Sequence, residues 1–211
     1  AGPDPLKGRR ALIIHSGGDS RRAPQYSASG KLFSPVPRVL PSGRRSTLFD
    51  EFIIGMSAVP GRMKDGILVL SGDVLLLFNP LQIDFHFEGA AALSVREGIE
   101  HGVQHGVFLP SADGGVARFL HKLPEDALRE AGAVDDMGRV ALDTGAVLMD
   151  SALCASLLSL IETDGEVDDQ KLKACLSPKA RLSFYADFLY PLASDATLEK
   201  YHLEKPEGEF T

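Results

Sequence analysis

Residues 12–37 read LIIHSGGDSRRAPQYSASGKLFSPVP and join a short apolar run to a glycine turn and a basic loop. The apolar run, residues 12–14, predicts a buried strand that ends at Ser16-Gly17-Gly18. Adjacent glycines let the backbone approach a ligand closely, and open α/β sheets bind ligands beyond the carboxyl ends of their strands. The stretch therefore predicts a ligand site at the edge of an α/β sheet.

Three basic residues, Arg21, Arg22 and Lys31, indicate what this site binds. Guanidinium groups bind phosphate through paired hydrogen bonds, an ammonium group acts as a point charge, and glycine amides cradle anionic oxygens. Two familiar phosphate loops are excluded, because Gln25 stands where the Walker loop has its first glycine, and Ser20 interrupts the dinucleotide-binding glycine pattern. The loop therefore indicates a phosphate site of another kind.

Residues 17–33, GGDSRRAPQYSASGKLF, resemble the fucose-1-phosphate guanylyltransferase family. That family includes the nucleotidyltransferase half of bifunctional fucokinase/guanylyltransferase enzymes and a vestigial copy in animal fucokinases. The resemblance runs from about residue 9 to about residue 195 and implies a nucleotide-diphospho-sugar transferase fold, which is GT-A-like and Rossmann-like. Family members usually continue into a β-helix or kinase region, and we expect neither within residues 1–211.

The order of apolar and amphipathic segments predicts the α/β class independently. Short apolar runs predict strands, and helical periodicity between capping residues predicts helices. Strands that alternate with helices favour a mostly parallel mixed sheet flanked by helices. We expect a single nucleotidyltransferase domain over residues 1–211, with polar termini. The expected strands are 12–14, 67–70, 90–95, 107–109, 116–120 and 140–149, and the expected helices begin near 46, 124, 150 and 183.

Asp73 follows the apolar run 67–70 after the turn Ser71-Gly72. This order places a carboxylate at the same sheet edge as the first glycine turn, although an aspartate there can also cap the next element. Mg²⁺ in nucleotide sites takes one or two protein carboxylates. The resemblance of Ser-Gly-Asp-Val to the family's metal-binding segment implies that Asp73 binds Mg²⁺ (or Mn²⁺). The FYADF segment also resembles the family and makes Asp187 the candidate second ligand; the alternative is a polar residue on the outer face of a helix.

The resemblance also implies roles for the remaining candidates. Lys31 matches the sugar-phosphate-binding lysine, and either Arg21 or Arg22 matches the phosphate-clamping arginine; we favour Arg22 and assign Arg21 to nucleotide binding. Lys31 and Arg22 are the expected catalytic groups. The expected nucleotide contacts are Ser16, Gly17, Gly18, Ser71 and Gly72, and the expected sugar-phosphate contacts are His105, Lys122, Asp143, Thr144 and Gly145.

Several of these residues have another interpretation. Asp143 can cap a turn instead of binding sugar hydroxyls. His101 and His105 have the spacing of metal ligands on a helix, but the glycines around them favour loop and strand, which argues against a zinc site. His15 ends the first strand, and we expect it to be packed.

Charge and composition bound the partners. The net charge is −7, but residues 1–45 carry +7 and the remainder −14. A basic segment on an acidic protein suits a small anionic ligand and argues against a long nucleic-acid footprint. No apolar run approaches the ~20 residues that span a bilayer. No signal pattern opens the chain, and Cys154 and Cys175 favour reduced thiols, so we expect a cytoplasmic protein without membrane or nucleic-acid partners.

The resulting hypothesis is nucleotidyl transfer: a phosphate oxygen of L-fucose 1-phosphate attacks the α-phosphorus of GTP and gives GDP-L-fucose and pyrophosphate. The sugar and the base are implied by the resemblance, whereas the spacing of residues indicates a phosphate site with a metal ion. Two alternatives remain open, a non-catalytic nucleotide-binding or regulatory domain of a fucokinase and a pyrophosphorylase for another sugar 1-phosphate. Fusion to a kinase or β-helix domain in a longer chain is compatible with each of them.

Overall fold

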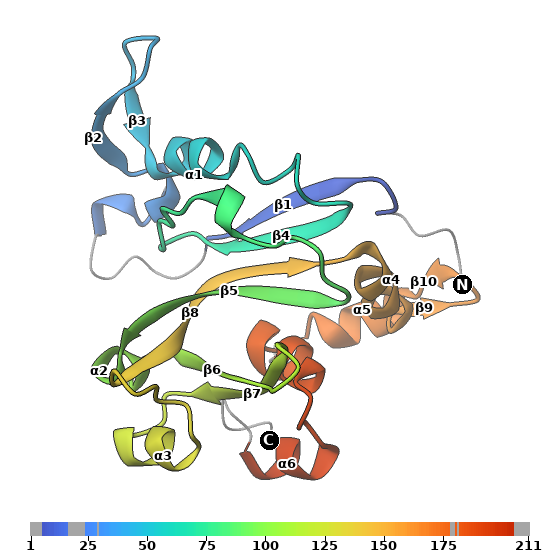
Figure 1. Ribbon diagram of the computed structural model, residues 1–211. Coiled ribbons are helices and arrows are strands. Elements are labelled where there is room, and N and C mark those ends of the chain that lie inside the picture. Colours follow the sequence, from blue (N-terminus) through green and yellow to red (C-terminus); the bar gives the residue numbers. More distant parts are fainter. Residues whose placement is uncertain (1–5, 17–23, 29, 178–179, 181, 205–211) are drawn as a thin grey trace. The chain divides into compact units, whose positions relative to one another are not determined.

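The computed structural model describes residues 6–16, 24–28, 30–177, 180 and 182–204 (Figure 1). Contacts divide the chain into two compact units. The amino-terminal unit consists of residues 6–92 with Thr144–Ala155, and the carboxyl-terminal unit consists of Leu93–Asp143 with residues 156–204. One long strand, β8 (Arg139–Met149), contributes its first half to the carboxyl-terminal unit and its second half to the amino-terminal unit. The single domain over 1–211 stays a prediction.

A parallel strand pair organises the amino-terminal unit. β1 (Arg10–His15) and β4 (Gly66–Ser71) run in the same direction, and their last residues, His15 and Ser71, lie opposite each other. β4 also pairs with the end of β8, in the antiparallel direction. The strands predicted at 12–14 and 67–70 are therefore confirmed, and they end at the same edge of the sheet.

The burial of these two strands differs. In β4, Leu68 and Leu70 are buried, as expected of a strand inside a sheet. In β1, Leu12 and Ile13 are 39% and 46% exposed, so the predicted burial of this strand is wrong. The reason is the position of β1 at the end of the hydrogen-bonded strand order, where a strand has a neighbour on one side.

A hairpin leads into the first helix of this unit. β2 (Pro35–Val39) and β3 (Arg45–Thr47) pair antiparallel, and α1 (Leu48–Met56) follows at once. The Thr47 hydroxyl accepts a hydrogen bond from the Asp50 N–H, and the Asp50 carboxylate accepts one from the Thr47 N–H, which completes a capping box. The helix expected to begin near residue 46 is confirmed.

An antiparallel hairpin organises the carboxyl-terminal unit. β6 (Gly106–Pro110) pairs with β7 (Val116–His121), with Gly106 opposite His121. β6 also pairs antiparallel with the first half of β8, and β5 (Ala90–Gly98) pairs with β8 as well. The core of this unit is an apolar cluster from β6, β7, β8, the two short helices beside them and the residues after the second helix: Ile99, Val107, Leu120, Leu128, Ala133 and Val140.

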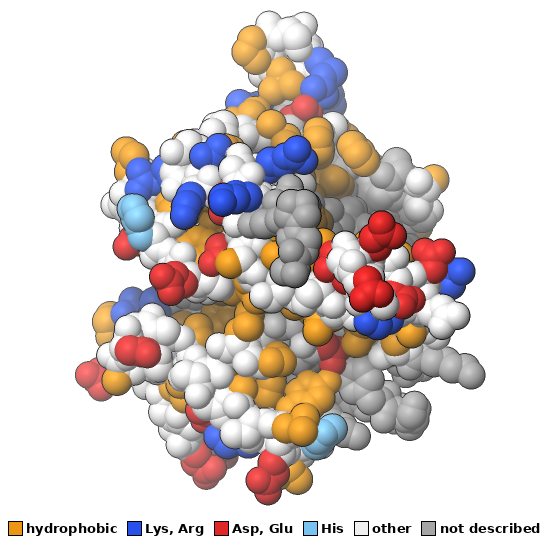
Figure 2. Space-filling model, turned by 90° about the vertical axis from the view of Figure 1, so that its right-hand side faces the viewer, with side chains coloured by type: hydrophobic (Ala, Val, Ile, Leu, Met, Phe, Trp, Pro, Cys, Tyr) orange, Lys and Arg blue, Asp and Glu red, His pale blue; other side chains and the backbone are white. Residues whose placement is uncertain are grey.

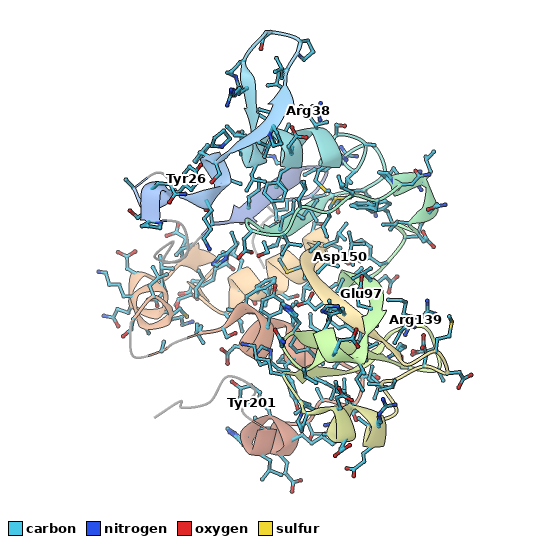
Figure 3. The ribbon with its side chains drawn as sticks, turned by 90° about the vertical axis from the view of Figure 1, so that its left-hand side faces the viewer. Tyr26, Arg38, Glu97, Arg139, Asp150 and Tyr201 are labelled. Carbon is cyan, nitrogen blue, oxygen red and sulfur yellow. The ribbon has the colours of Figure 1, made fainter. Side chains whose placement is uncertain are left out.

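The remaining elements are short. The Asp150 carboxylate (labelled in Figure 3) accepts a 2.7 Å hydrogen bond from the Leu153 N–H and so caps α4 (Ser151–Ser159), the helix expected to begin near residue 150. The helix expected from residue 183 is irregular, because Pro191 has no N–H to continue a helical ladder.

The other elements are η1 (Pro24–Tyr26), η2 (Lys31–Phe33), η3 (Pro80–Gln82), α2 (Ile99–Gly102), α3 (Glu125–Glu130), β9 (Glu162–Thr163), β10 (Glu166–Val167), α5 (Asp169–Cys175), the π-helical η4 (Phe184–Leu189), η5 (Tyr190–Leu192) and α6 (Leu198–Glu204). Within the described ranges, no helix has the length and apolar character needed to cross a bilayer.

The mixed α/β sheet is confirmed, but the prediction that it is mostly parallel is wrong. The β1–β4 pairing is parallel, whereas β4–β8, β6–β8 and β6–β7 are antiparallel. Only residues 111–115 separate β6 from β7, and a parallel pair needs a crossover of a dozen residues or more. The length of the connection therefore indicates strand direction, which apolar periodicity alone does not.

We predict that Thr47→Ala lowers the free energy of unfolding by about 1 kcal/mol, because the variant lacks the hydroxyl that caps α1. Urea denaturation followed by circular dichroism measures the change. Ser42→Ala, at an exposed position of the β2–β3 turn, is the control and should change stability by less than about 0.5 kcal/mol. Equal losses in the two variants would contradict the capping role.

We also predict a pH dependence at the start of α1. Arg44 contacts the Asp50 carboxylate at 2.8 and 2.9 Å and, together with Thr47, lowers the pKa of Asp50 well below its usual range. A lowered folded-state pKa stabilises the protein above the unfolded value of about 4, and this contribution is lost as the pH falls below it. The stability difference between the wild type and Asp50→Asn should therefore shrink between pH 6 and pH 3; a difference that grows on acidification would refute the assignment.

Candidate functional site

The candidate site begins where β1 and β4 end. His15 and Ser71 lie opposite each other in the last pair of the parallel register, so the residues that follow both strands leave the sheet at one edge. The Gly72 N–H donates a 2.8 Å hydrogen bond to the His15 carbonyl oxygen, one residue beyond the ladder. This bond holds the turn after β4 against the end of β1.

Gly72 has no room for a side chain. A Cβ atom there would lie 2.9 Å from the His15 carbonyl oxygen and 3.3 Å from the Cα atom of Ser16. Among the described residues, the close approach that requires this glycine is therefore to the backbone of β1. The absence of a Cβ lets Asp73 follow directly beside the end of both strands.

Asp73 is exposed, and Ser71 orients it. The Ser71 hydroxyl donates a 2.7 Å hydrogen bond to Oδ1 of Asp73. Within the described ranges no lysine or arginine forms an ion pair with Asp73. The carboxylate thus presents negative charge at the sheet edge.

Lys31 reaches the same edge from the loop after β1. It is the first residue of η2, and the preceding Gly30 has a φ of +77°, a conformation that favours glycine. The Gly30 N–H donates to the carbonyl oxygen of Tyr26 (labelled in Figure 3), and Leu32 is buried, so the backbone on both sides of Lys31 is anchored. The Lys31 side chain is half-buried.

These residues share one cavity of about 190 Å³. Its lining consists of His15, Ser16, Lys31, Ser71, Gly72 and Asp73. Sites for whole drug-sized ligands typically measure about 300–1,000 Å³, so this cavity matches one part of a nucleotide, such as a phosphate group. The structure therefore joins five of the predicted site residues, from two segments far apart in sequence, in one polar cavity.

In this region His15 differs from its expected environment, and four of the predicted site residues lie outside the described part of the chain. His15 is exposed and lines the cavity, so the expectation that it is packed is wrong; its position as the last residue before the glycine turn was the available signal. Gly17, Gly18, Arg21 and Arg22 lie outside the described residues, and their predicted roles stay predictions.

A second group of candidates gathers in the carboxyl-terminal unit. The Lys122 N–H donates a 3.1 Å hydrogen bond to the His105 carbonyl oxygen, and both side chains are exposed. A Cβ atom at Gly106 would lie 3.3 Å from Cβ of Asp143, which places Asp143 beside them. The next two candidates along β8, Thr144 and Gly145, belong to the amino-terminal unit.

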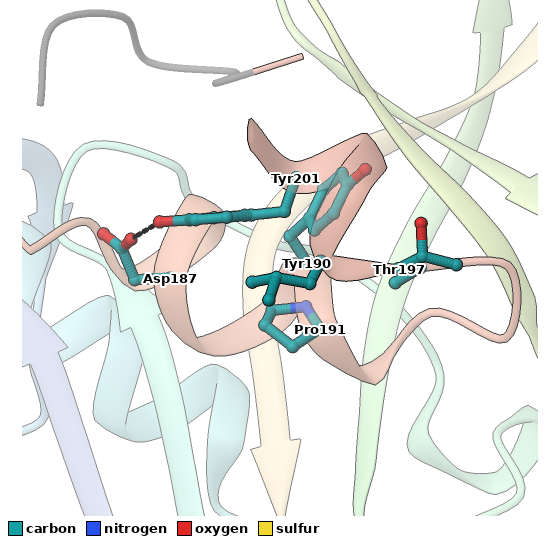
Figure 4. Close-up of a pocket in the computed structure, with 7 residues that line it drawn as sticks. Asp187, Tyr190, Pro191, Thr197 and Tyr201 are labelled. Carbon is teal, nitrogen blue, oxygen red and sulfur yellow. Dashed lines mark hydrogen bonds between the residues drawn. The ribbon is translucent and has the colours of Figure 1, made fainter. Parts of the chain in front are cut away.

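Asp187 is half-buried in the carboxyl-terminal unit and is already hydrogen-bonded (Figure 4). Its carboxylate accepts a 2.6 Å hydrogen bond from the Ser183 N–H and another from the Tyr201 hydroxyl. The bond to Asp187 raises the pKa of Tyr201 to about 12, so this hydroxyl keeps its proton. Asp187 also lines a separate cavity of about 430 Å³, with Tyr190, Pro191, Ala196, Thr197, Leu198 and Tyr201.

The donor set at the sheet edge fits a magnesium ion. No cluster of three or more His, Cys, Asp and Glu side chains with metal-binding geometry occurs among the described residues. Mg²⁺ at nucleotide sites needs no such cluster, because one or two carboxylates suffice when phosphate oxygens and water complete the shell. Asp73, exposed and next to Lys31 in the cavity, is a suitable single carboxylate; the role of Asp187 as a second ligand stays a prediction.

The basic residues of the amino-terminal unit divide into two groups. Arg38 pairs with Glu51 at 2.7 Å and Arg44 with Asp50 at 2.8 Å, so two arginines hold α1 to the hairpin. Other basic side chains are exposed, and Figure 2 shows blue side chains grouped in the upper part of its view. The exposed ones in residues 6–16 are Lys7, Arg9 and Arg10.

The structure defines the class of protein as an α/β domain with a polar cavity at the edge of its sheet. A lysine, two serines and a carboxylate are among the residues that line this cavity. The family is given by comparison with known proteins. The model of the fucose pyrophosphorylase domain matches residues 3–211, and the chain belongs to this family. The resemblance found in the loop after β1 is thus confirmed.

Three curated relatives are similar over most of this chain. The bifunctional fucokinase/GDP-fucose pyrophosphorylase of Arabidopsis thaliana is 26% identical over 87% of the chain. The fucose-1-phosphate guanylyltransferases of Homo sapiens and Mus musculus are 29% and 26% identical over 89% and 95% of it. The matches cover 18%, 34% and 38% of these relatives, so the chain spans well under half the length of each.

We predict that Gly72→Ala lowers the free energy of unfolding by about 1–3 kcal/mol, because the added Cβ overpacks the contact with His15. Gly61→Ala is the control, since a Cβ there meets nothing within 4 Å and the backbone angle is ordinary. Thermal and urea denaturation of both variants measure the effect. Equal stability of the two variants would show that the turn after β4 is not constrained as described.

Proposed function

We propose that this chain catalyses nucleotidyl transfer from GTP to L-fucose 1-phosphate, forming GDP-L-fucose and pyrophosphate. The observation that carries the proposal is the shared cavity in which Lys31 and Asp73 lie beyond the carboxyl ends of β1 and β4. The names of the curated relatives support the choice of sugar and base. A parallel strand pair followed by a glycine turn also supports a nucleotide-diphospho-sugar transferase fold.

The reaction makes a particular physical demand. A phosphate oxygen of the sugar phosphate forms a bond to the α-phosphorus of GTP, and the bond from that phosphorus to the bridging oxygen of pyrophosphate breaks. The attacking oxygen is already anionic near neutral pH, so no general base is needed. Two unit charges 4 Å apart repel by about 4 kcal/mol at an effective dielectric constant of 20. Catalysis therefore depends on positioning and counter-charge.

The cavity residues meet this demand in the proposal. Lys31 neutralises the sugar phosphate at the point of attack. Its half-buried position reduces the solvent screening between the ammonium group and a phosphate oxygen, which strengthens their attraction. Ser16 and the backbone of Gly72 contact the nucleotide, and His15 adds a ring nitrogen to the same wall. Arg22, or Arg21 in its place, is assigned to the triphosphate. His105, Lys122 and Asp143 are assigned to the sugar.

Asp73 would hold a magnesium ion, and Asp187 is the proposed second ligand. When bound, the ion screens the negative charge of the phosphate oxygens. Mn²⁺ has similar ligand preferences and is the expected substitute. Neither Cys154 nor Cys175, both in the described part of the chain, forms a disulfide, which supports a proposed cytoplasmic location.

The test of the proposed function is a panel of sugar 1-phosphates assayed against the four nucleoside triphosphates, with pyrophosphate release as the readout. Release with L-fucose 1-phosphate and GTP at least tenfold faster than with other pairs supports the proposal. A different best pair indicates a pyrophosphorylase for another sugar or base. GTP binding without any pyrophosphate release indicates a non-catalytic domain.

We predict that Lys31→Ala and Asp73→Asn each lower kcat by about two orders of magnitude or more, because each removes a charge partner of the transition state. The matched controls are Lys64→Ala and Glu88→Gln, exposed positions of the same unit that do not line the cavity. Steady-state rates of pyrophosphate release measure the effect. Wild-type turnover in either cavity variant would remove that residue from the mechanism.

A further inference from the structure

Ser71 occupies a position that the strand pairing determines. It is the last residue of β4 and lies opposite His15, while the next residue is held by the Gly72 N–H bond to the His15 carbonyl oxygen. The backbone on both sides of Ser71 is therefore fixed relative to β1. Its side chain lines the same cavity as Lys31 and Asp73.

The hydroxyl of Ser71 acts on one oxygen of Asp73. It donates a 2.7 Å hydrogen bond to Oδ1, and none of the described residues donates a hydrogen bond to Oδ2. An exposed aspartate otherwise samples several rotamers, each of which directs its oxygens differently. The hydrogen bond from the serine favours one of these rotamers, and the Asp73 side chain it orients lines the cavity.

We propose that Ser71 is a positioning residue for Asp73. The Ser71 hydroxyl holds one carboxylate oxygen of Asp73, so that the other oxygen binds Mg²⁺ in preference to Ca²⁺. The inference rests on the proposed function, because it takes Asp73 as the metal-binding carboxylate. Mg²⁺ requires nearly ideal octahedral geometry and binds carboxylates through single oxygens, whereas Ca²⁺ takes six to eight oxygens and accepts two from one carboxylate. A carboxylate with one oxygen held by a hydroxyl suits the first ion better than the second.

The size of the effect follows from how such supporting groups behave elsewhere. Hydrogen-bond partners of metal ligands typically change metal affinity or activity by about 10–100-fold when they are removed. Ser71→Ala should weaken the magnesium complex because Asp73 loses its orientation. It should affect the calcium complex little, because the released oxygen becomes available as an additional ligand.

The experiment measures binding without turnover. The probe is a GTP analogue with a methylene group between the α- and β-phosphorus atoms, titrated calorimetrically in saturating Mg²⁺, in saturating Ca²⁺ and in chelator alone. Ser71→Ala is compared with Ser71→Thr, which keeps the hydroxyl, and with Asp73→Asn. Ser57→Ala is the matched control, because it removes another 2.7 Å serine hydrogen bond, to the carbonyl oxygen of Ile54 at an exposed helix end.

We expect Ser71→Ala to raise the Kd with Mg²⁺ about tenfold relative to its own value in chelator, and to change the Kd with Ca²⁺ less than about twofold relative to that value. Ser57→Ala should match the wild type, and Ser71→Thr should keep the wild-type ratio between the Kd values in Mg²⁺ and in chelator. The double variant Ser71→Ala/Asp73→Asn should bind no more weakly than Asp73→Asn alone.

Three outcomes would overturn the inference. If Ser71→Ala keeps the wild-type Mg²⁺ preference while Asp73→Asn loses it, Ser71 has no positioning role, but the metal-binding role of Asp73 stands. If Asp73→Asn also keeps wild-type values, both the inference and the metal assignment in the proposed function are wrong. If Ser71→Ala weakens binding by the same factor in chelator and in Mg²⁺, Ser71 acts on the nucleotide or the fold and does not act through Asp73, which contradicts the inference.

Discussion

The contact between Gly72 and the carbonyl oxygen of His15 is the constraint on which the candidate site depends. A parallel pair of strands brings two carboxyl ends to one edge, but the chains normally diverge after the last ladder bond. Here the N–H of Gly72 extends the pairing by one residue, and the missing Cβ permits the approach. Ser71 and Asp73 therefore lie next to His15 and Ser16, and these residues line one cavity together with Lys31.

The basic residues of the amino-terminal unit differ in what they contact: some form ion pairs within the fold, and one lines the cavity. The excess of basic residues before residue 46 suggests a ligand-binding surface when it is counted from the sequence. The structure assigns part of it to the fold, because Arg38 and Arg44 form ion pairs with the acidic residues in the first turn of α1. Ion pairs at exposed positions contribute little stability individually. Their consequence here is that fewer cations remain for an anionic ligand, and among the described residues Lys31 is the one in the cavity.

Strand pairing and hydrogen bonds also determine how the candidate residues of the carboxyl-terminal unit are placed. His105 and Lys122 are seventeen residues apart, and they become neighbours because β6 and β7 form a direct hairpin. Asp187 was proposed as a metal ligand from its sequence context, and the structure shows its carboxylate accepting hydrogen bonds from Ser183 and Tyr201. A carboxylate has about four lone-pair positions, so these two bonds restrict its orientation while leaving capacity for another partner.

The sequence by itself determined the family, the α/β class, the position of most strands and the starts of α1 and α4. These are local properties, set by residue type, periodicity and the hydrogen bonds available within a few residues. The tertiary structure alone decided the direction of the strands, the exposure of β1 and of His15, the bond from Ser71 to Asp73 and the partners of Asp187. Each of these depends on which distant segment lies alongside, and the free energy of that choice comes from pairing and burial across the chain rather than from any single stretch of it.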